Sequence, residues 1–196
     1  MEERDNTGRL PSWRYEEIKK ILSALLCLCH VTHFPISGFE IAHELGIRVI
    51  PYSHVSEKLR EAYETASHDG FHIIDPKMHI TIYYNDGMPY ERVNFTLLHE
   101  IAHIVLGHLE HSELAEKEAN FAGGFMAAPP AVLDLINPQS PREVALVCQL
   151  SRQASIHAFN RLQSWRFIKQ QFPLTSYERR LRDQFSEGRE LATPRS

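Results

Sequence analysis

The chain has 196 residues, enough for one domain with a sizeable hydrophobic core. Its formal net charge of −4 at pH 7 argues against a nucleic-acid-binding surface that covers the whole chain. The N-terminus is charged, and the longest apolar stretch, residues 21–31, is shorter than the roughly 20 residues that cross a bilayer. Three cysteines, an odd number, favour a reducing compartment. We therefore expect a cytoplasmic protein without a membrane partner, in which Cys27 and Cys29 are buried thiols.

The first half of the chain mixes helical periodicity with short alternating segments. Residues 1–11 are expected to be disordered, Ser12 to cap the first helix and Gly46 to end the second. Turn residues separate the segments that alternate with a period of two, which is typical of strands. The predicted elements are a helix at 12–30, a helix at 35–45, a strand at 47–51, a helix at 56–66 and a hairpin with strands at 71–74 and 79–84.

The second half of the chain is predicted to be helical. Pro89 is well placed to open a helix, and Ser140 begins a capping box with proline at the first helical position. The region after Ser140 resembles a helix-turn-helix pair, but it has little basic excess, so a packing or substrate-docking role is favoured over direct nucleic-acid binding. The predicted helices run from 89 to about 108, 112 to 128, 140 to about 150 and 151 to 167, with a polar tail from 173 that contains a short helix at 177–182.

The most informative motif is the H-E-x-x-H sequence from His99 to His103, inside an apolar stretch that reads as one helix. Its i, i+4 spacing puts both imidazoles on one face of that helix. Two neutral imidazoles so placed can bind a zinc ion, and Glu100 beside them is a candidate base. Without a further ligand, the same residues describe an amphipathic helix with two histidines at its polar edge.

A catalytic zinc site needs a third protein ligand and leaves one position for water. The extended motif with a third histidine fails, because Leu106 and Leu109 stand where glycine and histidine are required. A glutamate on the next helix fits instead. With a rise of about 1.5 Å per residue, an antiparallel return brings Glu116 level with His103.

Two acids of that helix, Glu116 and Glu118, compete for the role of third ligand. Glu116 is favoured, because its face carries small residues that let two helices approach, and because Asn120 lies one turn on as a possible partner for a ligand histidine. Glu118 falls among apolar residues, so burial could instead favour it.

The chain resembles the ImmA/IrrE-type zinc metallopeptidases, which are gluzincin-like, over about residues 15–165. Ser151 and Ala154 match the start of a family segment Ser-x-x-Ala-x-x-x-Arg, but Ala158 occupies the arginine position and the next arginine is Arg161. The other matching segments are 35–36, 40–49, 80–85, 95–108 and Glu-Lys-Glu-Ala-Asn-Phe-Ala at 116–122, followed by Pro129.

We expect an α+β fold: a mostly helical zincin-like domain with a small sheet of about three strands beside the H-E-x-x-H helix, followed by C-terminal helices. The resemblance implies one catalytic Zn²⁺, bound by His99, His103 and Glu116, with Glu100 as the catalytic base. It implies an endopeptidase that cleaves a regulatory DNA-binding protein, such as a helix-turn-helix repressor of a mobile element or of a stress response. The alternative is a non-proteolytic metal-binding regulator that binds a repressor or DNA. The domain organisation expected on this basis is a disordered segment at 1–11, a zincin-like metallopeptidase domain at 12–138, a helical pair packed on it at 139–172 and a polar tail at 173–196.

Two further expectations concern the substrate. In the peptidases that the chain resembles, an edge strand beside the site often binds the substrate backbone, so the strand at 79–84 is expected at an exposed sheet edge or, equally, as an ordinary strand. A donor is also needed to stabilise the oxyanion. The candidates are His108, Tyr83 and Tyr84, and the sequence does not rank them.

Overall fold

The computed structural model describes residues 9–110 and 112–192, with side chains to residue 188. The predicted disorder at 1–11 falls mainly on residues 1–8, which lie outside the described residues, while Leu10 is buried in the core. The elements are α1 (Ser12–Leu28), α2 (Gly38–Glu44), β1 (Arg48–Pro51), η1 (Tyr52–His54), α3 (Glu57–Ala66), β2 (Gly70–Ile74), β3 (Ile80–Tyr84), α4 (Tyr90–Leu106), α5 (Glu113–Ala127), α6 (Pro130–Leu133), η2 (Asp134–Ile136), α7 (Pro141–Cys148), α8 (Arg152–Lys169) and α9 (Ser176–Ala192). This is the mostly helical α+β fold with a three-stranded sheet that the sequence predicts.

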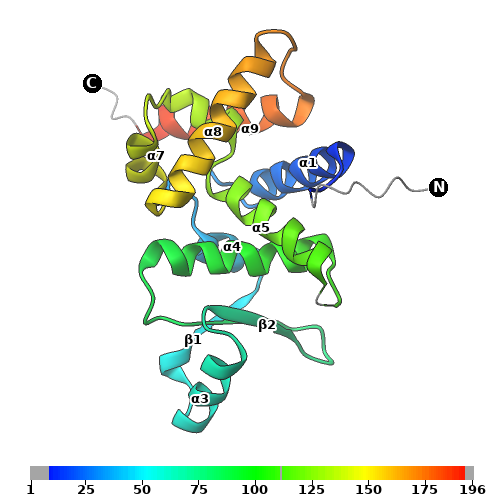
Figure 1. Ribbon diagram of the computed structural model, residues 1–196, viewed down its shortest axis with the longest axis vertical. Coiled ribbons are helices and arrows are strands. Elements are labelled where there is room, and N and C mark those ends of the chain that lie inside the picture. The colour runs from blue at the N-terminus through cyan, green and yellow to red at the C-terminus, as the bar shows by residue number, and fades with distance from the viewer. Residues whose placement is uncertain (1–8, 111, 193–196) are drawn as a thin grey trace, which may run out of the picture.

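The elements form layers around α4, which runs through the middle of the molecule (Figure 1). One side of α4 packs on β2 and β3, and the other side packs on α5. On the far face of the sheet, Tyr63 of α3 contacts Phe71 and Tyr83, with both ring-centroid distances at 4.9 Å. Beyond α5 lie α1, α8 and α9. The helix that carries the H-E-x-x-H motif is therefore enclosed by a sheet and a helical layer.

The order of the strands decides which of them lies at the edge of the sheet. The sheet runs β1-β3-β2, with β1 parallel and β2 antiparallel to β3. The strand at 79–84 is therefore central, and the edge strand of the hairpin is β2. Of the two expectations for the strand at 79–84, an exposed edge and an ordinary strand, the edge is wrong, because the chain crosses through α3 and brings β1 alongside the other side of β3. Alternation within a strand gives its two faces and carries no information about its neighbours.

The C-terminal segment is more ordered than its polar sequence indicates. The helix expected at 177–182 continues to Ala192, and Leu181 and Phe185 are buried against α1 and α6. Gln184 also donates to the carbonyl oxygens of Leu26 and Val31, at 3.1 and 2.7 Å. Two buried apolar side chains one turn apart are a weak sequence signal, which explains why the expected helix was too short.

One helical segment in the described part of the chain, Glu113–Ile136, is long and apolar enough to cross a bilayer. However, 67% of its most apolar stretch is buried inside the protein, as in the core helix of a globular domain. Its apolar side chains contribute to the core, as do the thiols of Cys27 and Cys29, which are free and buried as expected. A smaller apolar cluster joins α7 and α8 to α6.

The side chain of Asn94 fastens α2 to α4. Its Oδ1 accepts from the Gly38 amide at 2.7 Å, and its Nδ2 donates to the Ile36 carbonyl oxygen at 2.9 Å. Gly38 packs so closely on α4 that a Cβ there would lie 2.6 Å from the Leu97 Cβ. The buried amide therefore satisfies two backbone groups inside the protein.

Asn94→Ala is expected to lower the free energy of unfolding by about 2 kcal/mol or more, because it leaves a buried N–H and a buried C=O without partners. Urea unfolding followed by circular dichroism measures the change. Asn160→Ala, at an exposed helical position of α8, is the control and should stay within about 0.5 kcal/mol of the unaltered protein. Equal midpoints for the two variants would show that this contact contributes nothing.

Candidate metal centre

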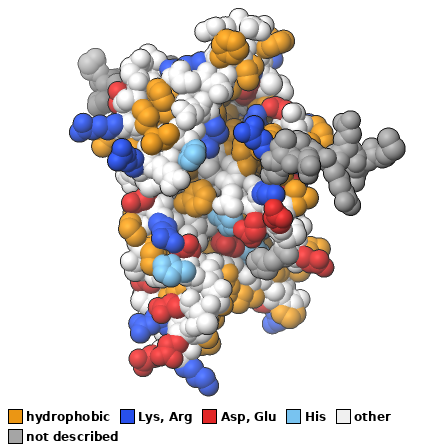
Figure 2. Space-filling view, in the orientation of Figure 1, with side chains coloured by type: hydrophobic (Ala, Val, Ile, Leu, Met, Phe, Trp, Pro, Cys, Tyr) orange, Lys and Arg blue, Asp and Glu red, His pale blue; other side chains and the backbone are white. Residues whose placement is uncertain are grey.

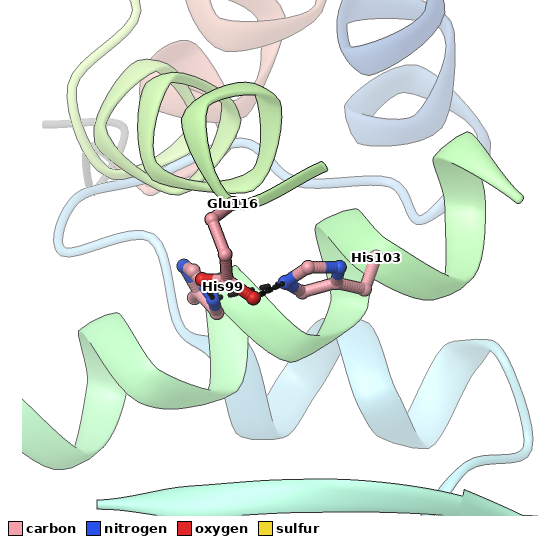
Figure 3. A group of neighbouring side chains, drawn as sticks. All are labelled: His99, His103 and Glu116. Carbon is pink, nitrogen blue, oxygen red and sulfur yellow. Dashed lines mark hydrogen bonds and ion pairs between the residues drawn. The ribbon is translucent and has the colours of Figure 1, made fainter. Parts of the chain in front are cut away.

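Three side chains from two helices converge at one point (Figure 3). His99 and His103 extend from one face of α4, and their Nε2 atoms lie 3.0 Å apart. Glu116 reaches down from α5, with one carboxylate oxygen 3.4 Å from His99 Nε2 and the other 3.3 Å from His103 Nε2. The three residues form a group of potential metal ligands.

The spacing of these atoms fits a tetrahedral metal site. Bonds of about 2.0–2.1 Å at tetrahedral angles place neighbouring ligand atoms about 3.3–3.4 Å apart. The three measured separations, 3.0, 3.3 and 3.4 Å, lie close to that value. Two imidazoles and one carboxylate also form the donor set of His2Glu zinc sites. The residues present therefore fit a zinc ion.

The local sequence explains why α5 returns at the right place. Gly107 ends α4 in the left-handed conformation, with φ at 72°, a value that glycine adopts without strain. Ser112 then caps α5 by accepting from the Ala115 amide at 3.1 Å. At Gly123 a Cβ would lie 3.4 Å from the His99 backbone nitrogen, so the missing side chain allows α5 to lie close to α4.

A chain of hydrogen bonds supports His103 from behind. Its Nδ1 lies 3.0 Å from Nδ1 of His108, and Nε2 of His108 lies 3.0 Å from a carboxylate oxygen of Glu118. Glu118 is held in turn by one edge of the Arg14 guanidinium: Nε donates to one carboxylate oxygen at 2.7 Å, and Nη2 donates to the other. These hydrogen bonds therefore connect Arg14 of α1, through Glu118 of α5, to His103 of α4.

This arrangement selects the tautomer of His103 that can bind a metal. The ionised Glu118 only accepts, so Nε2 of His108 donates to it, and a neutral His108 then accepts at Nδ1. His103 must therefore donate from Nδ1, which leaves the lone pair of its Nε2 directed at the ligand group. Burial, together with the neighbouring His99, lowers the pKa of His103 to about 4, so the ring is neutral at pH 7.

The structure separates the two competing glutamates. Glu116 faces the histidine pair, and its side chain is 44% exposed. Glu118 is buried and is engaged by Arg14 and His108. Burial raises the pKa of Glu118, but the hydrogen bonds from these two partners outweigh it, and the net pKa lies below its usual range. Glu118 is thus a charged support of the site rather than a neighbour of the two Nε2 atoms.

The motif glutamate has a partner that sequence reasoning missed. A carboxylate oxygen of Glu100 accepts from Nδ1 of His72 at 2.7 Å, and both side chains are nearly buried. His72 lies on the edge strand β2, on the sheet face toward α4, whereas Phe71 faces α3. The alternation of the strand could have given its face. Only the tertiary fold shows that this face meets Glu100.

The other expected contacts turn out differently. Tyr83 packs among aromatic rings on the far face of the sheet, and Tyr84 packs edge-on against Phe39 with ring centroids 5.5 Å apart. Neither tyrosine lines the cleft, and both ring nitrogens of His108 are already engaged. Asn120 lines the cleft, but Nδ1 of His99 is buried without a hydrogen-bond partner among the described residues.

The group of ligands lies in a cleft of about 920 Å³ between β2, α4 and α5. Figure 2 shows acidic and histidine side chains gathered over α4 and α5 on this side of the molecule. β2 forms one wall, and the exposed side chains of Met78 and Leu109 lie at its margin. The cleft therefore combines a charged floor with an unpaired strand edge and exposed apolar side chains.

These features agree with the comparison to known families. The model of the Peptidase_M78 family, described as the IrrE N-terminal-like domain, matches residues 42–129. The matched segment holds β1 to β3, α4 and α5, and so contains the whole ligand group, but it excludes Arg14 of α1. No curated protein matches the chain.

Variants at the ligand group should separate ligands from supports. Glu116→Gln is expected to abolish stoichiometric metal binding, whereas His108→Ala should weaken affinity about 10- to 100-fold by freeing the His103 ring. Competition with a chromophoric chelator and elemental analysis give the affinity and the metal content. Glu113→Gln, at an exposed acid of the same helix, is the control. Loss of metal in Glu118→Gln but not in Glu116→Gln would identify Glu118 as the ligand.

Proposed function

We propose that this chain is a zinc-dependent endopeptidase. The premise is that it belongs to the ImmA/IrrE family of peptidases through its residues 42–129. The observation that carries the proposal is the convergence of His99, His103 and Glu116 beside a buried Glu100. A zinc ion held there would supply a water of lowered pKa and a positive charge to polarise a peptide carbonyl.

The remaining chemistry falls to residues of the chain. Glu100 takes the proton of the attacking water and later gives it to the leaving nitrogen. His72 fixes the orientation of that carboxylate through its 2.7 Å hydrogen bond. A purely binding protein needs neither a base nor a residue to orient it, so this buried pair favours hydrolysis over the alternative of a non-proteolytic regulator.

The shape of the cleft favours an extended polypeptide as substrate. β2 is the edge strand next to the ligand group, so a peptide can pair with its free N–H and C=O groups. Met78 and Leu109, which are 73% and 91% exposed, offer apolar contacts to side chains of the peptide. The finer proposal, that the substrate is a helix-turn-helix repressor, rests on the family resemblance. A cytoplasmic location accords with the free thiols.

Glu100→Gln is expected to retain zinc and to cut about 10²- to 10⁴-fold more slowly, because the amide cannot accept the proton. The assay incubates each form with the protein encoded by the neighbouring gene, follows cleavage by mass spectrometry and measures zinc by elemental analysis. Cleavage at the unaltered rate would rule out Glu100 as the base. Full biological activity of the variant without any cleavage would support the non-proteolytic regulator.

Substitutions at His72 test its effect on the base. His72→Phe should lower kcat about tenfold or more with little change in KM, because a hydrogen bond to a charged group is lost. His72→Asn, which keeps an N–H donor near the position of Nδ1, should recover part of that loss. Zinc content and the unfolding midpoint serve as controls. An equal loss in both variants would show that shape rather than the donated hydrogen bond matters.

A further inference from the structure

A second cavity adjoins the cleft on the side away from the sheet. It has a volume of about 720 Å³, lies between α4, α5 and α8, and shares the walls Phe95 and Asn120 with the cleft. A third cavity, of about 610 Å³, continues beyond it toward α1 and α9. Arg161 of α8 lines both of these cavities. Arg161 also contacts α5, the helix that carries Glu116, through a hydrogen bond to the Gly124 carbonyl oxygen.

Arg161 is a cation without an acidic partner. Its Nη2 donates to the Gly124 carbonyl oxygen at 2.6 Å, while its Nε is buried and has no hydrogen-bond partner. Among the described residues, no carboxylate lies within ion-pair distance of Arg161, although Glu91 lines the same cavity. Burial lowers the pKa of this guanidinium, so its charge is held in a poorly solvated place.

The other lysines and arginines that line the two cavities are all paired within the described part of the chain. Arg92 binds Asp69 at 2.6 Å, and Lys19 binds Glu16 at 2.7 Å. Lys169 binds Glu178 at 2.7 Å. Among the described lysines and arginines that line the two cavities, Arg161 is therefore the only one without an acidic partner. Its positive charge can bind an anionic group from another molecule.

The backbone of α5 is shaped to receive this guanidinium. At Gly124 a Cβ would lie 3.4 Å from Nη1 and 3.6 Å from Nη2 of Arg161, so the glycine leaves the guanidinium close against the helix. This contact accounts for a glycine that otherwise only weakens a helix. It also holds the guanidinium in one orientation, which favours recognition of a planar anion.

We propose that Arg161 binds a carboxylate of the polypeptide substrate, in a subsite that adjoins the catalytic cleft. The inference rests on the proposed peptidase function. The donors fit one carboxylate better than a phosphate, because Nη2 already serves Gly124 and Glu91 in the same cavity would repel a dianion. The carboxylate comes either from an Asp or Glu side chain or from the C-terminus of the peptide.

The test measures binding separately from cleavage. Zinc-loaded Glu100→Gln protein is applied to arrays of synthetic 12-residue peptides, each present with Glu or with Gln at every acidic position, and with a free or amidated C-terminus. The second protein carries R161Q as well, and the matched control carries R152Q, which removes the same charge from an exposed site of α8. Inorganic phosphate serves as a competitor.

The unaltered subsite should favour acidic peptides about 10- to 100-fold, R161Q should abolish that preference and R152Q should keep it. R161K should retain only part of it, because lysine lacks the planar fork. Preference that follows the free C-terminus, rather than internal Glu, identifies the C-terminal carboxylate as the source. Equal binding of acidic and neutral peptides, an unchanged preference in R161Q, or competition by phosphate without any peptide preference would overturn the proposal.

Cleavage of the same arrays by the unaltered enzyme distinguishes the two proposals. If the enzyme cleaves peptides but shows no Arg161-dependent preference for acidic ones, the proposed subsite is wrong and the proposed peptidase function stands. An Arg161-dependent preference in binding, with no peptide cleaved by zinc-loaded enzyme, would leave an anion-binding site in a protein that is not a peptidase, and would overturn the assignment of the carboxylate to a substrate.

Discussion

The hydrogen-bond chain from Arg14 through Glu118 and His108 to His103 is the constraint on which the site depends. Each member fixes the next: the guanidinium keeps the buried carboxylate ionised, the carboxylate orients one ring, and that ring sets the tautomer of the other. Two histidines at i, i+4 are common on helices. What distinguishes this pair is that His103 is held so that its Nε2 faces Glu116.

The same chain makes the site a property of the whole fold. Arg14 belongs to α1, outside the segment that matches the family, whereas the ligand group lies entirely inside that segment. α1 is fixed in turn by α9, whose Gln184 donates to carbonyl oxygens at and beyond the end of α1. The terminal helices, which carry none of the proposed ligands, therefore support the orientation of His103, a proposed ligand.

The sequence predicted the parts of the site that depend on local geometry. Helical spacing gives the histidine pair, and helix rise with an antiparallel return brings Glu116 level with it. The preference for Glu116 over Glu118 came from the small residues on its face, and the structure shows Gly123 packed against His99 as that idea requires. The parts that depend on strand order could not be predicted, since alternation does not reveal which strand is central. His72 was missed for this reason, because its partner lies on a different element and 28 positions away in sequence.

The position of His72 connects binding of a substrate with the chemistry. β2 is at once the strand with a free edge toward the cleft and the strand that holds Glu100. A peptide that pairs with this edge would lie beside His72, which orients the proposed base, so a shift in the strand would move both together. On the opposite side, Arg161 is fastened to α5, the helix that carries Glu116. A polypeptide that contacts β2 and Arg161 would thus be positioned by the two elements that hold the proposed base and the proposed carboxylate ligand, and an error in its placement would separate the peptide bond from both.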